Sequence, residues 1–165
     1  MNETFLEVLV KRKTPVTMKV GQILLIILTV LLALLSLGMG AVILLLAVLT
    51  GVGAYFTGLL SNVEYEYSYL NKELDVDVIY SMQRRKHLVT YDLTKLEVLA
   101  PASSYHLDAY KNRNVKTKDF SSQKAENQNE VYVMYIGGND KVVFEPTPEL
   151  IKAIANIAPR KVFTE

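Results

Sequence analysis

The sequence predicts a membrane protein with an N-terminal two-helix transmembrane hairpin and a small soluble α+β domain. Residues 20–63 contain no charged side chain, and the sequence Ser36-Leu37-Gly38-Met39-Gly40 interrupts this apolar stretch near its middle. After it, short runs alternate apolar and polar residues, as in strands. About 44 helical residues would be about 65 Å long, roughly twice the hydrocarbon thickness of a bilayer. Two helices joined by a tight turn therefore fit the stretch, and one helix does not.

The hairpin is expected over residues 20–61, with spans at about 20–37 and 41–60. Backbone groups in a bilayer need partners within the segment, so both spans are predicted to be helices. The apolar run is much longer than the core of a secretory signal peptide, so cleavage is not expected. In the preceding segment, residues 1–19, residues 3–13 are interpreted as a short amphipathic helix at the membrane interface or as a frayed tail.

Basic residues predict the orientation of the hairpin. Residues 1–19 carry four cations against two carboxylates, whereas the turn between the spans is uncharged. The cations are Lys11, Arg12, Lys13 and Lys19. The positive-inside rule places the N-terminus in the cytoplasm. Two crossings return the chain to that side, so we expect a two-pass protein of the cell membrane with both termini cytoplasmic.

Small side chains recur along one face of each span at a 4-3-4 spacing. The residues are Thr29, Ala33, Ser36 and Gly40 in the first span and Ala47, Gly51, Ala54 and Gly58 in the second. Small residues let two helix backbones approach closely in lipid. The stripes are expected to pack the hairpin against itself. In the alternative, part of a stripe serves homo-oligomerisation or a membrane partner.

The soluble domain, residues 62–165, begins with strand patterns. Residues 63–70 predict a half-exposed strand, with three tyrosines on one face and Glu64, Glu66 and Ser68 on the other. A turn at Asn71-Lys72 leads to a second strand that ends at Tyr80. We expect a connection at Arg84-Arg85-Lys86 and a strand at 87–91. Residues 93–99 are strand or one helical turn, ended by Pro101.

The C-terminal half predicts a polar loop, a hairpin and one helix. Residues 111–130 are polar and are interpreted as a mobile loop. The strands at 131–136 and 141–145 flank Gly137-Gly138-Asn139-Asp140, a hairpin signal, and the first of them is apolar on both faces and expected to be central. A helix over about 148–158 begins after Thr147 as its N-cap.

This order of strands, polar loop, hairpin and helix, carried by residues 65–80, 85–99 and 131–158, resembles the pleckstrin-homology-like (PH-like) domains of small bacterial membrane proteins. The sequences Leu9-Val10-Lys11-Arg12-Lys13 and Ala158-Pro159-Arg160-Lys161-Val162 are similar to an uncharacterised family of two-pass bacterial proteins, a domain of unknown function. The resemblance implies an architecture and a location, with no activity or catalytic residues. Five or six strands can be placed by pattern, fewer than a complete PH-like barrel contains.

Composition excludes several kinds of chemistry. The chain has no cysteine, and its only histidines are His87 and His106, so thiolate chemistry and a multi-histidine metal centre are excluded. A net charge of +1 argues against nucleic acid as a partner. Asp75 and Asp77 point the same way on a strand and could hold a cation, although a solvated strand face explains them as well. His87 beside three cations could sense pH or bind an anion, or lie in a surface turn. We predict no cofactor, no metal and no catalytic residue.

The basic residues of the soluble domain are the best candidates for a binding function. The candidate contacts with an anionic lipid surface are Arg84, Arg85, Lys86, Lys111, Arg113, Lys116 and Lys118. Neighbouring carboxylates would oppose such contacts. The sequence therefore favours a membrane-tethered interaction or scaffold module without catalytic activity, in contact with the bilayer and with a protein partner or a second copy. The alternatives are a sensor of anionic lipid and an enzyme with an unrecognised site.

Overall fold

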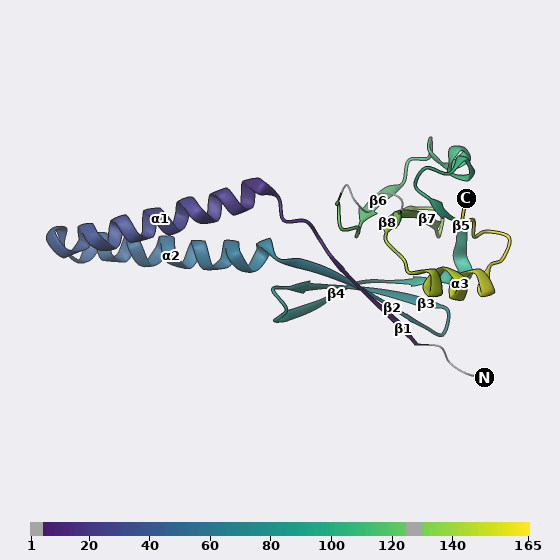
Figure 1. Ribbon diagram of the computed structural model, residues 1–165, viewed down its shortest axis with the longest axis horizontal. Helices are drawn as coiled ribbons and strands as arrows, with labels where there is room; N and C mark the ends of the chain where they lie inside the picture. The colour runs from purple at the N-terminus through teal and green to yellow at the C-terminus, as the bar shows by residue number, and fades with distance from the viewer. Residues whose placement is uncertain (1–4, 125–129) are drawn as a thin grey trace. The chain divides into compact units, whose positions relative to one another are not determined.

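The computed structural model describes residues 5–124 and 130–165 (Figure 1). Contacts divide the chain into two compact units. The first, the hairpin unit, comprises residues 14–63 and 80–84. The second, the β-unit, comprises residues 1–13, 64–79 and 85–165.

Two antiparallel helices form the hairpin unit: α1 (Val16–Met39) and α2 (Ala41–Ser61) (Figure 1). Gly40 alone separates them, with a φ of 90° that a residue with a side chain rarely adopts. Its N–H donates to the Ser36 carbonyl at 3.1 Å. Both helices are long and apolar enough to cross a bilayer, as the sequence predicts for a two-pass protein.

Small and hydroxyl side chains bring the two helices together. Ala47 and Ala54 on α2 are buried, at 4% and 6% exposure. The Thr29 hydroxyl on α1 lies 3.1 Å from the Thr50 hydroxyl on α2. A Cβ built on Gly51 would lie 3.3 Å from the Thr29 methyl carbon, and one built on Gly58 would lie 2.5 Å from Gln22 Nε2. Glycine at both positions therefore allows the close approach of α1.

The other residues of the first stripe are less buried than Ala47 and Ala54 of the second. Ala33 and Gly40 are exposed, and Ser36 is half-buried, with its hydroxyl donating to the Ala33 carbonyl at 2.7 Å. In the first stripe, Thr29 is the residue that contacts Thr50 and Gly51 of α2. In the second stripe, Ala47 and Ala54 are buried and Gly51 and Gly58 allow the close approach of α1.

The β-unit contains a four-stranded sheet, here sheet A, in the order β1-β2-β3-β4. Its strands are β1 (Leu6–Lys11), β2 (Val63–Leu70), β3 (Glu73–Tyr80) and β4 (Arg84–Asp92). β1 and β2 are antiparallel neighbours, with a register from Leu6↔Tyr69 to Lys11↔Glu64. The hairpin of α1 and α2 is thus inserted in the sequence between two strands that pair with each other.

The prediction of an interfacial helix or frayed tail near the N-terminus is wrong for residues 6–11, which form β1; residues 3 and 4 lie outside the described part. Alternate residues Leu6, Val8 and Val10 share the face of the β2 tyrosines. This period of two suits a strand, and six residues are too few to form a stable amphipathic helix. The partner strand lies more than fifty residues away, so pairing was not visible locally.

One turn of sheet A lies where the sequence predicts it, and the other does not. Asn71 and Lys72 both have positive φ, at 50° and 69°, as expected for a two-residue hairpin turn. The prediction of a connection at Arg84-Arg85-Lys86 is wrong, because these residues begin β4. The turn is at 81–83 instead, where the Ser81 N–H donates to the Asn62 carbonyl at 2.7 Å and its hydroxyl donates to the Leu59 carbonyl at 3.0 Å. These bonds satisfy carbonyls at the end of α2.

A second sheet, here sheet B, has the order β5-β7-β8-β6. It consists of β5 (Leu96–Pro101), β6 (Lys116–Asp119), β7 (Tyr132–Ile136) and β8 (Asp140–Phe144). The hairpin of β7 and β8 and the central place of β7 are as predicted. The mobile-loop prediction is wrong for β6, which pairs in parallel with β8. A polar edge strand looks like a loop in sequence; residues 125–129 of that predicted loop lie outside the described part.

Short helices complete the β-unit. The 3₁₀ helices η1 (Leu93–Lys95) and η2 (Tyr105–Tyr110) flank β5, and α3 (Pro148–Ile157) follows β8. Thr147 caps α3 as predicted, and the helix buries Leu150, Ile151 and Ile154.

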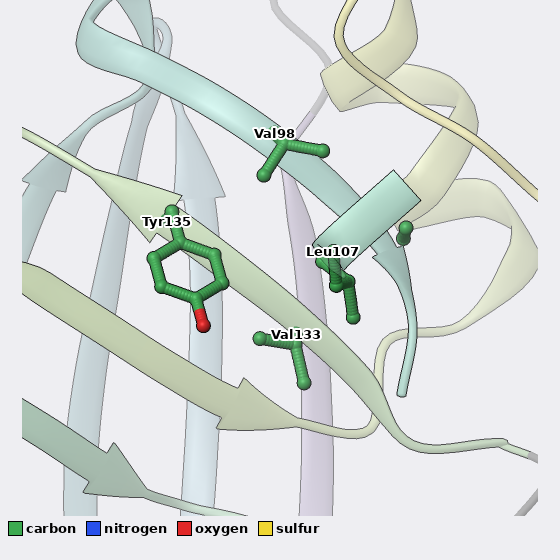
Figure 2. Packing of buried hydrophobic residues seen from close by; sticks show 5 residues of the cluster. Val98, Leu107, Val133 and Tyr135 are labelled. Atoms are coloured by element: carbon green, nitrogen blue, oxygen red, sulfur yellow. The ribbon is translucent and has the colours of Figure 1, made fainter. Parts of the chain in front are cut away.

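The core lies on both faces of sheet B. On one face the Tyr67 ring of β2 meets the Phe144 ring of β8 edge to face, with centroids 5.6 Å apart, and both side chains are buried. On the other, Val98, Leu107, Val133 and Tyr135 pack together, as Figure 2 shows. Burial on both faces explains why β7 is apolar throughout.

Candidate functional site

A groove of about 680 Å³ runs along β1 in the β-unit. One wall is β1 itself, from Val8 to Lys11. The other residues come from the start of β7 and from the junction of β8 and α3, with two more from the segment after β6. They are Ser122, Lys124, Glu130, Tyr132, Glu145, Pro146, Thr147, Pro148 and Ile151.

The wall formed by β1 presents backbone polar groups. β1 is the edge of sheet A, so one of its sides has no neighbouring strand among the described residues. The two-residue turn at 71–72 makes Leu70 and Glu73 the closing pair, so the backbones of the three β2 tyrosines face β1. Their partners in register are Leu6, Val8 and Val10. Strand alternation then directs the N–H and C=O groups of Glu7, Leu9 and Lys11 away from β2.

Hydrogen bonds next to β1 agree with this direction. The N–H of Lys13 donates to the Ser122 carbonyl at 2.7 Å, on the side away from β2. Lys11, Leu9 and Glu7 precede Lys13 at intervals of two residues and share its side. In the part of the chain that the structure describes, no backbone bond joins the outer groups of Leu9 or Lys11 to another segment. The free part of the edge is therefore the part that lines the groove.

The charged side chains that line the groove differ in how accessible they are to a partner. Glu145 is buried at 7% exposure and accepts from the Ser122 N–H at 2.8 Å and from its hydroxyl at 2.7 Å. The Lys11 side chain is 57% exposed, with Glu64 at 3.9 Å. Lys124 is half-buried in the wall. The accessible charges are thus the two lysines and Glu130.

Most of the basic candidates bind carboxylates of the chain itself. Lys111 lies 2.6 Å from Asp108, Arg113 lies 2.5 Å from Glu97, and Lys118 lies 2.9 Å from Asp140. Burial favours the neutral form of Lys118, but its interactions with Asp140 and Tyr91 together outweigh this and raise the pKa of the amine. Such cations attract an anionic surface less than free ones.

Arg85 reaches across sheet A from β4. Its guanidinium contacts Glu66 on β2 and lies 3.4 Å from Asp77 on β3. Glu66 is only 3% exposed, so the prediction that it lies on an exposed strand face is wrong. A buried carboxylate needs a partner, and Arg85 supplies it. Of the seven basic candidates, Arg84, Lys86 and Lys116 are exposed and have no ion pair among the described residues.

Asp77, His87 and Thr90 form a chain of contacts like that of a catalytic triad. His87 Nδ1 lies 2.8 Å from Asp77 Oδ1, and His87 Nε2 lies 3.3 Å from the Thr90 hydroxyl. Thr90 donates its proton to Asp75, however, so His87 is not positioned to remove it. The His87 side chain is 56% exposed on an open strand. The geometry suits a surface network that joins β3 and β4 and gives the two aspartates protein partners.

His106 has a structural environment as well. Its ring stacks on Phe163 with centroids 3.6 Å apart and an interplanar angle of 13°. Among the described residues, no group of three or more His, Asp and Glu side chains could hold a metal ion.

The whole sequence, compared with known protein families, identifies the family of the chain. A family model described as a bacterial PH-like domain, DUF6106, matches residues 2–164. The chain belongs to this family. Neither a curated protein nor a solved structure matches it.

The match extends over β1 and the helical hairpin as well as over the later strands. Within the matched range β1 pairs with β2 in the β-unit, and the hairpin lies between these two strands in the sequence. Two sheets and a C-terminal helix are consistent with this fold, as the resemblance implies.

Sequence reasoning missed the groove because it missed β1. The signal was present in the alternation of Leu6, Val8 and Val10 with Glu7, Leu9 and Lys11. Leu9 lies between Glu7 and Lys11 on the outer face of β1 and is 58% exposed, an apolar side chain on a charged strand face.

Proposed function

We propose that the PH-like domain docks a cytoplasmic protein in the β1 groove and holds it at the cell membrane, without catalysing a reaction. The observation that carries this proposal is the free backbone edge of β1 within a groove of about 680 Å³. Exposed strand edges are ready templates for pairing, and proteins usually cover or interrupt them. Here the edge borders apolar and charged side chains suited to a partner.

The alternative function as a sensor of anionic lipid has weaker support. Four of the seven basic candidates bind carboxylates of the chain: Arg85, Lys111, Arg113 and Lys118. The seven are also divided between β4 in sheet A and the segment from η2 to β6. A lipid surface is attracted best by several free cations close together.

Chain topology supports a cytoplasmic domain. β1 precedes the hairpin and β2 follows it, and the two strands pair directly. Both ends of the hairpin must therefore lie on one side of the membrane, which requires two crossings. Lys11, Arg12, Lys13 and Lys19 flank the first helix, so the positive-inside rule makes that side the cytoplasm.

Site-specific photo-crosslinking in intact cells tests the docking function. A photoreactive phenylalanine analogue is introduced at Leu9 in the groove, and in a separate variant at Tyr105, which is 71% exposed and does not line the groove. We expect one discrete crosslinked protein from position 9 and none in common with position 105. The band should weaken when Lys124→Glu reverses a charge in the groove wall. Identical products at both positions, or none at position 9, would contradict the proposal.

Cysteine labelling tests the orientation in the same cells. The chain has no native cysteine, so Gly38→Cys near the turn and Tyr105→Cys in the domain can be labelled singly. An impermeant maleimide should label position 38 only. Labelling of position 105 from outside would show that the domain does not face the cytoplasm.

A further inference from the structure

We infer that the docked partner is an extended, acidic segment that adds to sheet A as a fifth strand along β1. This inference rests on the proposed docking function and specifies its chemistry. Strand addition uses backbone hydrogen bonds for affinity and alternate side chains for selectivity.

Backbone geometry favours an extended partner. The outward groups of Glu7, Leu9 and Lys11 recur every second residue, the repeat with which an added strand exchanges hydrogen bonds. A helix satisfies its own backbone and would leave these groups without partners. The groove runs beside four consecutive β1 residues, Val8 to Lys11, about 13 Å of strand at the usual rise.

The apolar surfaces suit the alternate side chains of such a segment. On the core side, Val8 lines the groove on β1, with Tyr132 and Ile151 on the opposite wall. On the outer face, Leu9 is 58% exposed, with Glu7 and Lys11 two residues away on either side. A cross-strand apolar neighbour would cover Leu9 and account for its place on a charged face.

Charge favours an acidic segment. Two lysines, Lys11 and Lys124, line the groove against one exposed carboxylate, Glu130, while the Glu145 carboxylate is buried and accepts hydrogen bonds from Ser122. An acidic side chain opposite Lys11 would form a cross-strand pair of opposite charge, which stabilises a sheet, whereas a basic one would be repelled.

A synthetic peptide tests the inference on the full-length protein in nanodiscs. The probe has the sequence of residues 63–70, VEYEYSYL, because β2 already pairs with the inner edge of β1 and alternates acidic and aromatic residues. We expect saturable binding by fluorescence polarisation and slower amide exchange at Leu9 and Lys11. The control peptide VKYKYSYL, with both glutamates replaced by lysine, should bind at least about tenfold more weakly.

A proline in β1 separates strand addition from other docking. Leu9→Pro removes the N–H that faces the groove and leaves the Val8 and Val10 N–H groups to β2, a placement that edge strands tolerate. It should weaken peptide binding about tenfold or more, while Leu9→Ala, which keeps the N–H, should change binding less than about threefold. Unchanged protection of the Tyr67 amide verifies that sheet A remains folded.

Charge reversal provides a second variant that does not touch the backbone. Lys11→Glu with Lys124→Glu should reverse the preference toward the lysine peptide. Equal binding to Leu9→Pro and Leu9→Ala, or no binding of VEYEYSYL, overturns the inference. If crosslinking at Leu9 persists in that case, the docking function stands; if it is also absent, both fail. If the native protein forms concentration-dependent dimers that Leu9→Pro abolishes, a second copy of this chain occupies the groove. That result would also overturn the inference.

Discussion

The hairpin unit and the β-unit are both rich in apolar side chains, but they place them oppositely. Leu37 and Val42 in the helices are 86% and 73% exposed, whereas Tyr67 and Phe144 in the β-unit are 0% and 1% exposed. The helices cover so little of their own apolar surface that water is a poor solvent for them, and lipid a good one. The β-unit encloses its own core. The hairpin unit thus leaves apolar surface that suits a bilayer, whereas the β-unit buries its apolar side chains itself.

The two units are also joined in an unusual order. The hairpin lies between β1 and β2, so the β-unit needs residues from both sides of it. A division of the sequence at the end of the apolar stretch therefore separates β1 from the rest of the β-unit.

The largest effect is expected from two ways of removing the hairpin. Replacing residues 14–62 with a short Gly-Asn linker keeps β1 beside β2, so the product should be soluble, monomeric and well dispersed in its NMR spectrum. Deleting residues 1–62 removes β1 and uncovers the edge of β2 and its tyrosines. That protein should aggregate or remain unfolded, because several apolar side chains lose their cover at about 1.5–3 kcal/mol each.

Equal solubility and equal spectra for the two proteins would contradict this expectation. It would mean that β1 adds little to the β-unit. Aggregation of both would mean instead that the hairpin contributes to the core.

The next effect concerns the core that the β-unit forms by itself. Phe144→Ala removes a buried ring that contacts Tyr67, and should lower the free energy of unfolding by about 3–5 kcal/mol. Tyr105→Ala, at a side chain 71% exposed, should change it by less than about 0.5 kcal/mol. Urea denaturation of the hairpin-replaced protein measures both. A small loss for Phe144→Ala would show that the two sheets do not share a core.

Sequence patterns predicted the elements whose determinants are local. The hairpins at Asn71-Lys72 and at Gly137-Gly138, and the helix capped by Thr147, depend on turn and capping residues that stand next to each other. The apolar spans follow from composition alone. All of these elements lie where they were expected.

The elements that sequence patterns missed depend on distant partners. β1 pairs with a strand beyond the hairpin, and β6 is a polar strand held by β8. The sequence makes Arg85 a candidate contact with an anionic surface, whereas in the structure it pairs with Glu66, two strands away. Pairing across a sheet leaves no local signature in either partner, so these features and the groove required the structure.

A smaller effect tests how the hairpin unit packs. Gly58→Leu places a branched side chain where Gln22 Nε2 lies 2.5 Å from the position of a Cβ, and should cost about 1–3 kcal/mol of helix contact. Gly53→Leu meets nothing within 4 Å of the Cβ and should cost little. In the cysteine-free chain, the rate of disulfide formation between Thr29→Cys and Thr50→Cys reports the contact. Equal rates in the two leucine variants would show that Gly58 does not face α1.

The smallest effect uses pH to separate the two units. The residues from 20 to 63 include no Asp or Glu, whereas Asp119 in the β-unit accepts from the Ser121 N–H at 2.9 Å, the Ser121 hydroxyl at 2.6 Å and Gln123 Nε2 at 3.0 Å. Burial opposes the charge, but these hydrogen bonds outweigh it and lower the pKa of Asp119. Acidification should therefore weaken the β-unit and leave the contact of α1 with α2 unchanged.

The sign follows from that lowered pKa. The folded state binds the Asp119 proton less tightly than the unfolded chain, so the carboxylate stabilises the fold above its ordinary pKa of 3.8, and this contribution is lost as the pH falls through the lower folded value. Asp119→Asn should cost about 1 kcal/mol at neutral pH, and the difference from the native protein should shrink toward pH 3. Asp108→Asn, at an exposed ion pair, should change the free energy of unfolding by less than about 0.5 kcal/mol at either pH. Urea denaturation of the hairpin-replaced protein at pH 7 and pH 3 makes the comparison. A constant difference for Asp119→Asn would mean that the hydrogen bonds do not depend on the charge of the carboxylate.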